Sequence, residues 1–437
     1  MSPQNSAGVT VIGGGIAGLV VAYRLTQRNV PVVLLEQGPQ LGGLGVEGHI
    51  DGHLIERFYH CIMPSDDALL QLLDDLGLRE SIEWRSTTMG MVVEGDRYPF
   101  NTPIDLLRFS ALKPSQRVRF GAVSVALRYL GRGKDLDHMT TQAWLSGLYG
   151  DAIWTKMLQP MFGAKFGDSF ARVPARYIYE RLGREKNVAV RGYPRGGYRS
   201  IVEALSKAIR DGGGIIETSA RVAAVHNRVD GVEVVLDNRV VTSDFAVSTV
   251  PIPVLHQLAD DDLRPSLPPA EHAYQGVVNA AFLLRKPLDG HYWSPVIGCD
   301  TEFDGVIEMS ALSGTSRYGD HSLVYTMKYC DRNSPLFQED PEVVAGRWAT
   351  QLCALYPDRI THDDVVAVAV FRAPFVEPIP FVGQSHHRSD GHVPDTRISI
   401  ATTTQLFPDV TSWNSSTRLA ERIAQRIATT AIPVGTP

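Results

Sequence analysis

Cysteine, long apolar runs and charge of one sign are all scarce in this sequence, and each scarcity narrows what the chain can be. Its 437 residues include only four cysteines, which are far apart and form no C-x-x-C motif: Cys61, Cys299, Cys330 and Cys353. Such spacing argues against a disulfide framework and a zinc site, and it suits a reducing cytosol. No apolar run is long enough to span a bilayer, and the leader Met1–Gly8 is too short and polar for a signal or transit peptide. We therefore expect a soluble, cytoplasmic protein without a bound metal.

The net charge and the missing motifs exclude further functional classes. The formal charge is −6 at pH 7, which gives no support for a nucleic-acid partner. The sequence lacks the serine-hydrolase motif G-x-S-x-G, the P-loop G-x-x-x-x-G-K-[ST] and the metalloprotease motif H-E-x-x-H. It is 44% hydrophobic and 21% charged, as globular proteins are, and its length predicts two domains.

A dinucleotide-binding pattern does stand close to the start of the sequence. The apolar run Val9–Ile12 leads into the hexapeptide Gly13–Gly18, which has the form G-x-G-x-x-G. In such a unit the first glycine allows a tight turn, the second lets the backbone approach a pyrophosphate, and the third lets the helix pack close to the strand. The helix expected over residues 16–28 directs its free N–H groups at the phosphates. The contacts predicted here are Gly13, Gly15, Ile16, Ala17 and Gly18.

A second strand and a second glycine pair indicate which dinucleotide is bound. The apolar run Val32–Leu35 ends at Glu36, whose carboxylate can accept hydrogen bonds from a ribose 2′-OH and would repel a 2′-phosphate. The pair Gly42-Gly43 follows, and a simple nicotinamide-binding unit has no such pair. The glycine pair suits a chain that approaches a larger cofactor for a second time, after the first glycine loop, so we predict that the dinucleotide is FAD. The further contacts predicted for it are Glu36, Gln37, Gly42, Gly43 and Leu44.

The segment Glu36–Leu44 resembles the glutamate-plus-diglycine signature of the FAD amine oxidases and their relatives, which include protoporphyrinogen oxidases, phytoene desaturases and UDP-galactopyranose mutases. The stretches Ile55–His60 and Lys165–Gly167 are similar to a bacterial, protoporphyrinogen-oxidase-like subgroup. The resemblance implies an α/β fold, in which a Rossmann-like FAD-binding domain of the glutathione-reductase type is interleaved with an α+β substrate domain built on an antiparallel sheet. The FAD-binding domain would comprise residues 1–90, 192–270 and 384–437, and the substrate domain residues 91–191 and 271–383.

The spacing of apolar residues predicts the elements that follow the opening unit. We expect helices over 200–210, 342–355 and 417–429, and strands over 215–217, 221–226, 232–236, 245–249, 276–284, 323–329, 365–371 and 397–401. Residues 158–168 are expected to form a turn-rich connection and residues 402–416 a polar loop. Residues 103–150 look helical and basic. We expect their cations to lie on the solvent face of helices rather than to mark a membrane or nucleic-acid surface.

Two departures from the family pattern concern the flavin. Many amine oxidases carry a lysine on the strand that crosses the flavin, and the resemblance places Asn279 at that position. A neutral amide lacks the charge that stabilises reduced oxygen, which favours a dehydrogenase, a desaturase or a slow oxidase. At the C-terminal cofactor motif the sequence has Trp413-Asn414-Ser415 in place of a glycine-rich helix start, and Asn414 and Ser415 are expected to supply N–H groups and caps. The resemblance also places Val222 beside the adenosine, with a plain core role as the equal alternative.

The candidates for catalysis are aromatic, apart from Asn279. His60 lies in the loop that the resemblance places against the isoalloxazine, where it would be a base, a flavin-orienting donor, a substrate contact or only a structural histidine. On the strand over 323–329, alternation puts Tyr325 and Tyr329 on one face and Lys328 on the other, and we favour the tyrosine face. Trp413 would form one wall of the site. The candidate catalytic residues are His60, Asn279, Tyr325, Tyr329 and Trp413.

Together these inferences predict an FAD-dependent oxidoreductase that removes a hydride from a C–N, C–O or C–C bond of a small molecule to flavin N5. Two alternatives stay open. One is a non-redox mutase, similar to the UDP-galactopyranose mutases, that uses reduced flavin as a nucleophile on a nucleotide sugar. The other is a flavin-binding module without catalysis. Substrate identity depends on the side chains that line a cavity, and periodicity does not encode its shape.

Overall fold

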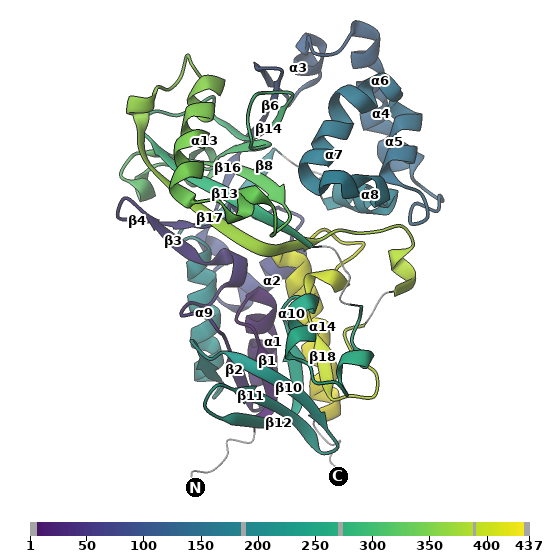
Figure 1. Ribbon diagram of the computed structural model, residues 1–437, viewed down its shortest axis with the longest axis vertical. Coiled ribbons are helices and arrows are strands. Elements are labelled where there is room, and N and C mark those ends of the chain that lie inside the picture. Colours follow the sequence, from purple (N-terminus) through teal and green to yellow (C-terminus); the bar gives the residue numbers. More distant parts are fainter. Residues whose placement is uncertain (1–6, 185–188, 270–273, 388–389, 432–437) are drawn as a thin grey trace.

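The computed structural model describes residues 7–184, 189–269, 274–387 and 390–431 of the chain. The chain forms two seven-stranded sheets. Figure 1 shows one sheet below the other, with a group of helices beside the upper sheet. Every strand of the lower sheet falls in the ranges predicted for the FAD-binding domain. Every strand of the upper sheet, apart from the start of β6, falls in the ranges predicted for the substrate domain. The domain boundaries themselves stay a prediction.

The first sheet has a parallel centre and an antiparallel edge. Its strand order is β10-β11-β12-β1-β2-β9, and β18 also pairs with β12. The neighbouring strands β9, β2, β1, β12 and β18 pair in parallel. The edge strands β10 and β11 pair antiparallel, β10 with β11 and β11 with β12. Their bounds are β1 Ala7–Ile12, β2 Val32–Leu35, β9 Ile215–Glu217, β10 Val222–Arg228, β11 Gly231–Leu236, β12 Val240–Ser248 and β18 Ile398–Ile400. Because helices cover both faces of parallel strands, β2 is a continuous apolar run, and all of it is buried.

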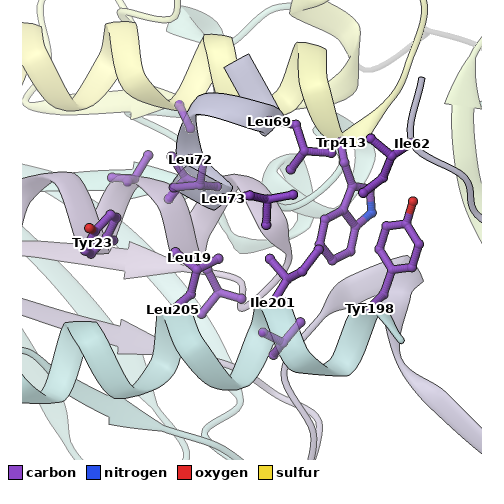
Figure 2. Close-up of a cluster of buried hydrophobic side chains, with 14 of the residues drawn as sticks. Leu19, Tyr23, Ile62, Leu69, Leu72, Leu73, Tyr198, Ile201, Leu205 and Trp413 are labelled. Atoms are coloured by element: carbon purple, nitrogen blue, oxygen red, sulfur yellow. The ribbon is translucent and has the colours of Figure 1, made fainter. Parts of the chain in front are cut away.

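Four helices share one apolar core against the first sheet. They are α1 (Ile16–Thr26), α2 (Asp67–Asp75), α9 (Tyr198–Asp211) and α14 (Trp413–Ala431). Figure 2 shows side chains from all four pointing toward one another, including Leu19, Leu72, Leu205 and Trp413. On the other face of the sheet, Ile252 and Leu255 of α10 (Ile252–Leu258) pack against Leu35 of β2 and other strand residues.

The second sheet is mixed rather than purely antiparallel. Its order is β17-β13-β16-β15-β14-β6-β7, and the pair β14–β6 is parallel. The predicted antiparallel sheet is therefore correct except at this pair. The bounds are β6 Thr88–Val93, β7 Asp96–Pro99, β13 Tyr274–Leu284, β14 His291–Ile297, β15 Gly305–Glu308, β16 Ser322–Cys330 and β17 Val365–Pro378. Val278 and Phe282 of β13 pack with α13 (Pro341–Leu355), whereas Val277 and Ala281 face the core shared with the first sheet.

Smaller elements complete the fold. The hairpin of β3 (Glu47–Ile50) and β4 (His53–Glu56) and the pair of β5 (Ile82–Ser86) with β8 (Val190–Pro194) lie outside the two large sheets. Residues 103–150 are helical as predicted, and the helical group comprises α3 Pro103–Arg108, α4 Pro114–Leu130, α5 Thr141–Tyr149, α6 Asp151–Ile153, α7 Gln159–Phe166 and α8 Ala175–Arg184. Among the described residues, no helix is both long enough and apolar enough to cross a membrane.

Two segments predicted to be irregular are helical instead. Residues 158–168 continue from a π-helical turn into α7 and then a 3₁₀ turn, with Pro160 at the second position of α7, directly after the π-helical turn. The helix α14 begins at Trp413, inside the predicted loop. Its start is fixed by reciprocal capping, in which the Ser415 amide donates to Ser412 Oγ at 3.1 Å and the Ser412 amide donates to Ser415 Oγ at 3.0 Å.

Candidate active site

The first glycine loop brings α1 as close to β1 as a backbone allows. Gly13 has a φ of +105°, which L side chains rarely adopt. A Cβ added at Gly18 would lie 2.0 Å from the carbonyl oxygen of Gly13, so only glycine fits there. Both positions therefore have the roles predicted from the G-x-G-x-x-G pattern, a tight turn and a close helix–strand contact.

The second glycine of the motif and the glycine pair form one backbone cradle. Gly15 caps the N-terminus of α1 with φ −73° and ψ 177°, and a Cβ built on it would meet only Gly43 Cα, at 3.7 Å. Gly43 in turn has no room on that side, since its Cβ would lie 3.0 Å from Gly15 Cα. The Gly42 amide donates to the Gly14 carbonyl oxygen at 2.8 Å and fixes the two turns together. Because the first-turn N–H groups of α1 lack intrahelical partners, this concave surface suits a pyrophosphate.

Glu36 stands at the end of β2 and faces this loop. Its Oε2 accepts a hydrogen bond from the Gly14 amide at 2.7 Å, and its Oε1 accepts one from the Gly38 amide at 2.8 Å. The Ala220 amide donates to the Glu36 carbonyl oxygen at 2.8 Å, so the segment before β10 crosses here. Val222 follows as a buried member of the core, and its place beside the adenosine stays a prediction. Gln37 is exposed.

The segment after the glycine pair leads from the cradle to the second sheet. Gly43–Gly45 is a 3₁₀ turn, and a Cβ at Gly45 would lie 2.4 Å from Cζ2 of Trp413. A Cβ at Gly48 would lie 2.7 Å from the ring of Phe371 on β17. Leu44 packs against the core between these contacts. The glycines at 45 and 48 thus let this segment pack closely against Trp413 and Phe371 on its way from α1 to the second sheet. It reaches the face of that sheet that points toward the core shared with the first sheet, here called the inner face.

The first turn of α14 offers its backbone but not its side chains to a ligand. Asn414 Oδ1 accepts a hydrogen bond from the Leu69 amide at 3.0 Å and so caps α2. Ser415 Oγ donates to the Val410 carbonyl oxygen at 2.8 Å in addition to its capping bond. These side chains hold the fold. Because the Ser415 amide already donates to Ser412 Oγ, the first-turn N–H groups that α14 could direct at a cofactor are those of Trp413 and Asn414.

His60 lies in an aromatic cluster at the same place. Its ring centroid is 4.9 Å from that of Tyr198 and 6.0 Å from that of Trp413, which Figure 2 shows at the edge of the core. His60 Nδ1 is 2.8 Å from the Phe58 carbonyl oxygen. Because a carbonyl can only accept, Nδ1 carries the proton, and the lone pair of the neutral ring is at Nε2. Burial lowers the pKa of His60, which favours this neutral form.

The inner face of the second sheet carries the other candidates. In the register, Asn279 stands opposite Met327 on β16 and Phe371 on β17. Asn279 is 1% exposed, and its Nδ2 donates to the Arg57 carbonyl oxygen at 2.7 Å. Lys328 points to the other face, where its Nζ lies 2.7 Å from Asp304 Oδ2. The alternation predicted for this strand is therefore correct.

The two tyrosines of β16 differ in what they can do. Tyr325 is fully buried, and its hydroxyl donates to the Glu56 carbonyl oxygen at 2.6 Å, so it ties the second sheet to β4. Tyr329 is only partly buried, and the pKa of its hydroxyl is raised well above the usual value, chiefly by desolvation. Of the two, Tyr329 is the one that stays partly exposed.

A charged group that was not predicted from the sequence lies beside Tyr329. Lys165 on α7 has its Nζ 3.0 Å from Glu377 Oε2 and 5.8 Å from the centroid of the Tyr329 ring. The hydroxyl of Tyr177 donates to Glu377 Oε1 at 2.7 Å. The sequence signal that could have identified Lys165 was the stretch Lys165–Gly167, which carried part of the family resemblance. Because this stretch was expected to form a turn, no side chain from it was placed in the site.

Two surface hollows lie elsewhere. The larger, of about 520 Å³, is lined in part by Arg97, Asp289, Asp358 and Arg359, whose charges pair with one another. The smaller, of about 260 Å³, lies between Pro287 and Ser322. Neither includes a residue of the glycine cradle or of the inner face.

Comparisons with known proteins agree with this geometry. A putative flavin-containing monoamine oxidase from Mycobacterium tuberculosis is 25% identical over 304 residues, which make up 64% of this chain and 65% of that relative. A putative protoporphyrinogen oxidase from Exiguobacterium sp. 255-15 has a TM-score of 0.77 at 17% identity, over 98% of this chain and 100% of that chain. A reduced UDP-galactopyranose mutase reaches 0.76 at 15% identity, over 98% and 97%. At such identities the two structural matches concern the fold alone.

The family match extends much further than the glycine motif. Residues 16–424 match the family described as flavin-containing amine oxidoreductase. The cradle of Gly15 and Gly43, which a single Cβ would fill, fits the pyrophosphate of the cofactor that this family uses. The chain therefore belongs to the flavin-containing amine oxidoreductases, with FAD as its cofactor.

Proposed function

We propose that this chain is an FAD-dependent oxidoreductase that oxidises a C–N, C–O or C–C bond of a small molecule. Bound FAD would supply the hydride acceptor, N5. The observation that carries the proposal is the course of the segment from Gly43 to Gly48, because it leads from the cradle to Phe371 on the inner face, opposite Asn279. The whole-protein activity rests on this geometry and on family membership.

The proposed task of the inner face is to exclude water and orient the substrate. Its rows around Asn279 are mainly apolar and aromatic, with Val277, Met327, Tyr329 and Phe371 as members or close neighbours. A dry surface strengthens the few polar contacts made within it and protects a hydride in transfer from solvent. The Lys165–Glu377 pair beside Tyr329 would supply the polar contacts.

His60 is proposed as a hydrogen-bond acceptor or base at Nε2. Its Nδ1 proton is held by the Phe58 carbonyl, and its lowered pKa keeps the ring neutral at neutral pH. The rings of Trp413 and Tyr198 pack against the His60 ring and help to fix its plane. Trp413 itself is packed on Gly45 in the core, so we propose for it a positioning role. A cytoplasmic location is also proposed, and the four free thiols support it.

Replacing Glu36 by alanine is expected to weaken FAD binding by about ten- to a hundredfold, since a charge-assisted hydrogen bond contributes roughly 1.5–3 kcal/mol. The variant loses the ribose acceptor and also frees the amides of Gly14 and Gly38. Glu36→Gln is the matched control, because it keeps the shape and one acceptor oxygen but loses the charge, and it should fall between. Equilibrium titration of apoprotein with FAD measures both. An unchanged Kd for Glu36→Ala would place the ribose elsewhere.

Anaerobic mixing with candidate amines, amino sugars and alcohols tests the redox function. A substrate should bleach the oxidised flavin, and His60→Phe should slow the bleaching by at least about tenfold, which is at the low end for loss of a general base. Because the His60 pKa is lowered, the wild-type rate should be level from neutral to mildly alkaline pH and fall only in acid. His60→Phe keeps an aromatic ring against Tyr198, so its fold should survive.

The same experiment distinguishes the rivals. A mutase that uses reduced flavin would convert a nucleotide sugar without net bleaching, and a binding module would convert nothing. The proposal would be refuted in favour of the mutase if no compound of the three classes bleached the flavin and the prereduced protein turned over a nucleotide sugar.

A further inference from the structure

The basic helical segment exposes large apolar side chains, where sequence analysis expected cations to face solvent. Among the described residues ten large hydrophobic side chains are exposed, and five of them lie on α3 and α4: Ile104, Leu107, Val118, Val125 and Tyr129. These five, here named the α3–α4 surface, are between 58% and 80% exposed, and the others are scattered over the rest of the chain. Single exposed apolar residues are normal, but a group of them indicates a binding surface.

On α4 the exposed apolar residues form a stripe. Val118, Ala122, Val125 and Tyr129 follow one another at spacings of four, three and four residues, which places them on one face of the helix. The opposite face carries Phe120, Val123 and Leu127, which pack into the core of the helical group. The helix therefore has two apolar faces, and only one of them is used by the fold.

Cations lie beside the stripe. Between residues 103 and 150 the sequence has seven Lys and Arg against three Asp, a net charge of +4 in a chain whose total is −6. The guanidinium of Arg132 lies 4.9 Å from the centroid of the Tyr129 ring, next to the end of the stripe. Arg119 lies on the flank of the stripe, and its Nε donates to the Leu148 carbonyl oxygen at 2.9 Å. The partner of this surface is therefore expected to be apolar at its centre and anionic around it.

We propose that the α3–α4 surface rests on a bilayer rich in anionic lipid, with the stripe among the acyl chains and the cations at the headgroups. An exposed apolar stripe flanked by Lys and Arg is the arrangement of helices that lie in the plane of a membrane interface. A second copy of the chain fits less well, because a twofold contact would bring two segments of net +4 together. Nucleic acid fits less well too, since aliphatic side chains neither stack on bases nor bind phosphate.

Co-sedimentation of the FAD-loaded protein with vesicles tests this proposal. We expect binding to mixed phosphatidylcholine–phosphatidylglycerol vesicles at low ionic strength, weak binding to phosphatidylcholine alone, and release as salt is raised. The double variant Val125→Gln/Tyr129→Gln should lower the partition coefficient at least about tenfold, through loss of buried apolar area. Lys113→Glu/Lys134→Glu should lower it at least about tenfold through loss of attraction to anionic lipid.

Matched substitutions elsewhere on the surface provide the controls. Val229→Gln changes an exposed apolar residue in the β10–β11 turn, and Lys207→Glu/Arg210→Glu reverses two exposed charges on α9; neither should affect binding. Retained flavin absorbance and an unchanged Tm show that each variant is folded. Wild-type protein that stays in the supernatant with the mixed vesicles would overturn the proposal. So would stripe variants that bind like the wild type, or a dimer that dissociates when the stripe is changed, which would assign the surface to a second copy.

Discussion

Replacing Gly15 by valine should leave the protein folded but colourless. The backbone at Gly15 has φ −73° and ψ 177°, an extended conformation that valine adopts readily. A Cβ there would meet no protein atom within 4 Å other than Gly43 Cα, at 3.7 Å. The fold therefore has room for the added Cβ, and we expect the valine side chain to fill the cradle into which the pyrophosphate must fit. We expect a loss of FAD affinity of at least about a hundredfold, or ~2.7 kcal/mol.

Gly18 provides the contrast that separates a binding effect from a folding effect. A Cβ at Gly18 would lie 2.0 Å from the Gly13 carbonyl oxygen, so Gly18→Ala must push α1 away from β1 and should lower Tm sharply. Gly15→Val should instead keep the far-UV circular dichroism and the Tm of wild-type apoprotein. Flavin absorbance per protein after gel filtration measures occupancy. Full occupancy of Gly15→Val would show that the pyrophosphate does not approach this glycine.

The cofactor cradle could be predicted from sequence because its determinants are local. A tight turn, a close helix–strand contact and an acid at a strand end are each set by a few neighbouring residues, and Gly13, Gly18 and Glu36 stand where these rules put them. The strand alternation that separates Lys328 from Tyr329 is local too, since it follows from the period of a β-strand alone.

The use of polar side chains could not be predicted, because their partners are distant in sequence. Asn414 caps the amide of Leu69, 345 residues away, and Tyr325 donates to Glu56, 269 residues away. Periodicity gives each of these residues a face but not a partner. The helix start at Trp413 was missed for a related reason, since capping by Ser412 depends on a serine pair that also suits a loop.

Asn279 shows how a distant partner changes the design of a test. Its Nδ2 donates to the carbonyl oxygen of Arg57, in the segment that leads to His60, so any substitution also releases this segment. A variant that adds charge must therefore be compared with one that loses the same hydrogen bond without adding charge. Asn279→Met serves this purpose for Asn279→Lys, because methionine is unbranched and flexible and carries no charge.

Asn279→Lys should accelerate reoxidation of the photoreduced protein by oxygen at least about tenfold over Asn279→Met, which corresponds to ~1.4 kcal/mol of barrier. An ammonium on the inner face would stabilise negative charge as oxygen accepts electrons, and the low dielectric of a site that is 1% exposed would strengthen the effect. Anaerobic flavin reduction by substrate should change equally in both variants, because it does not need the cation. Stopped-flow absorbance separates the two half-reactions. Equal reoxidation rates in the two variants, or a wild-type protein that already reoxidises as fast as known oxidases, would contradict the proposal that the neutral Asn279 limits the reaction with oxygen.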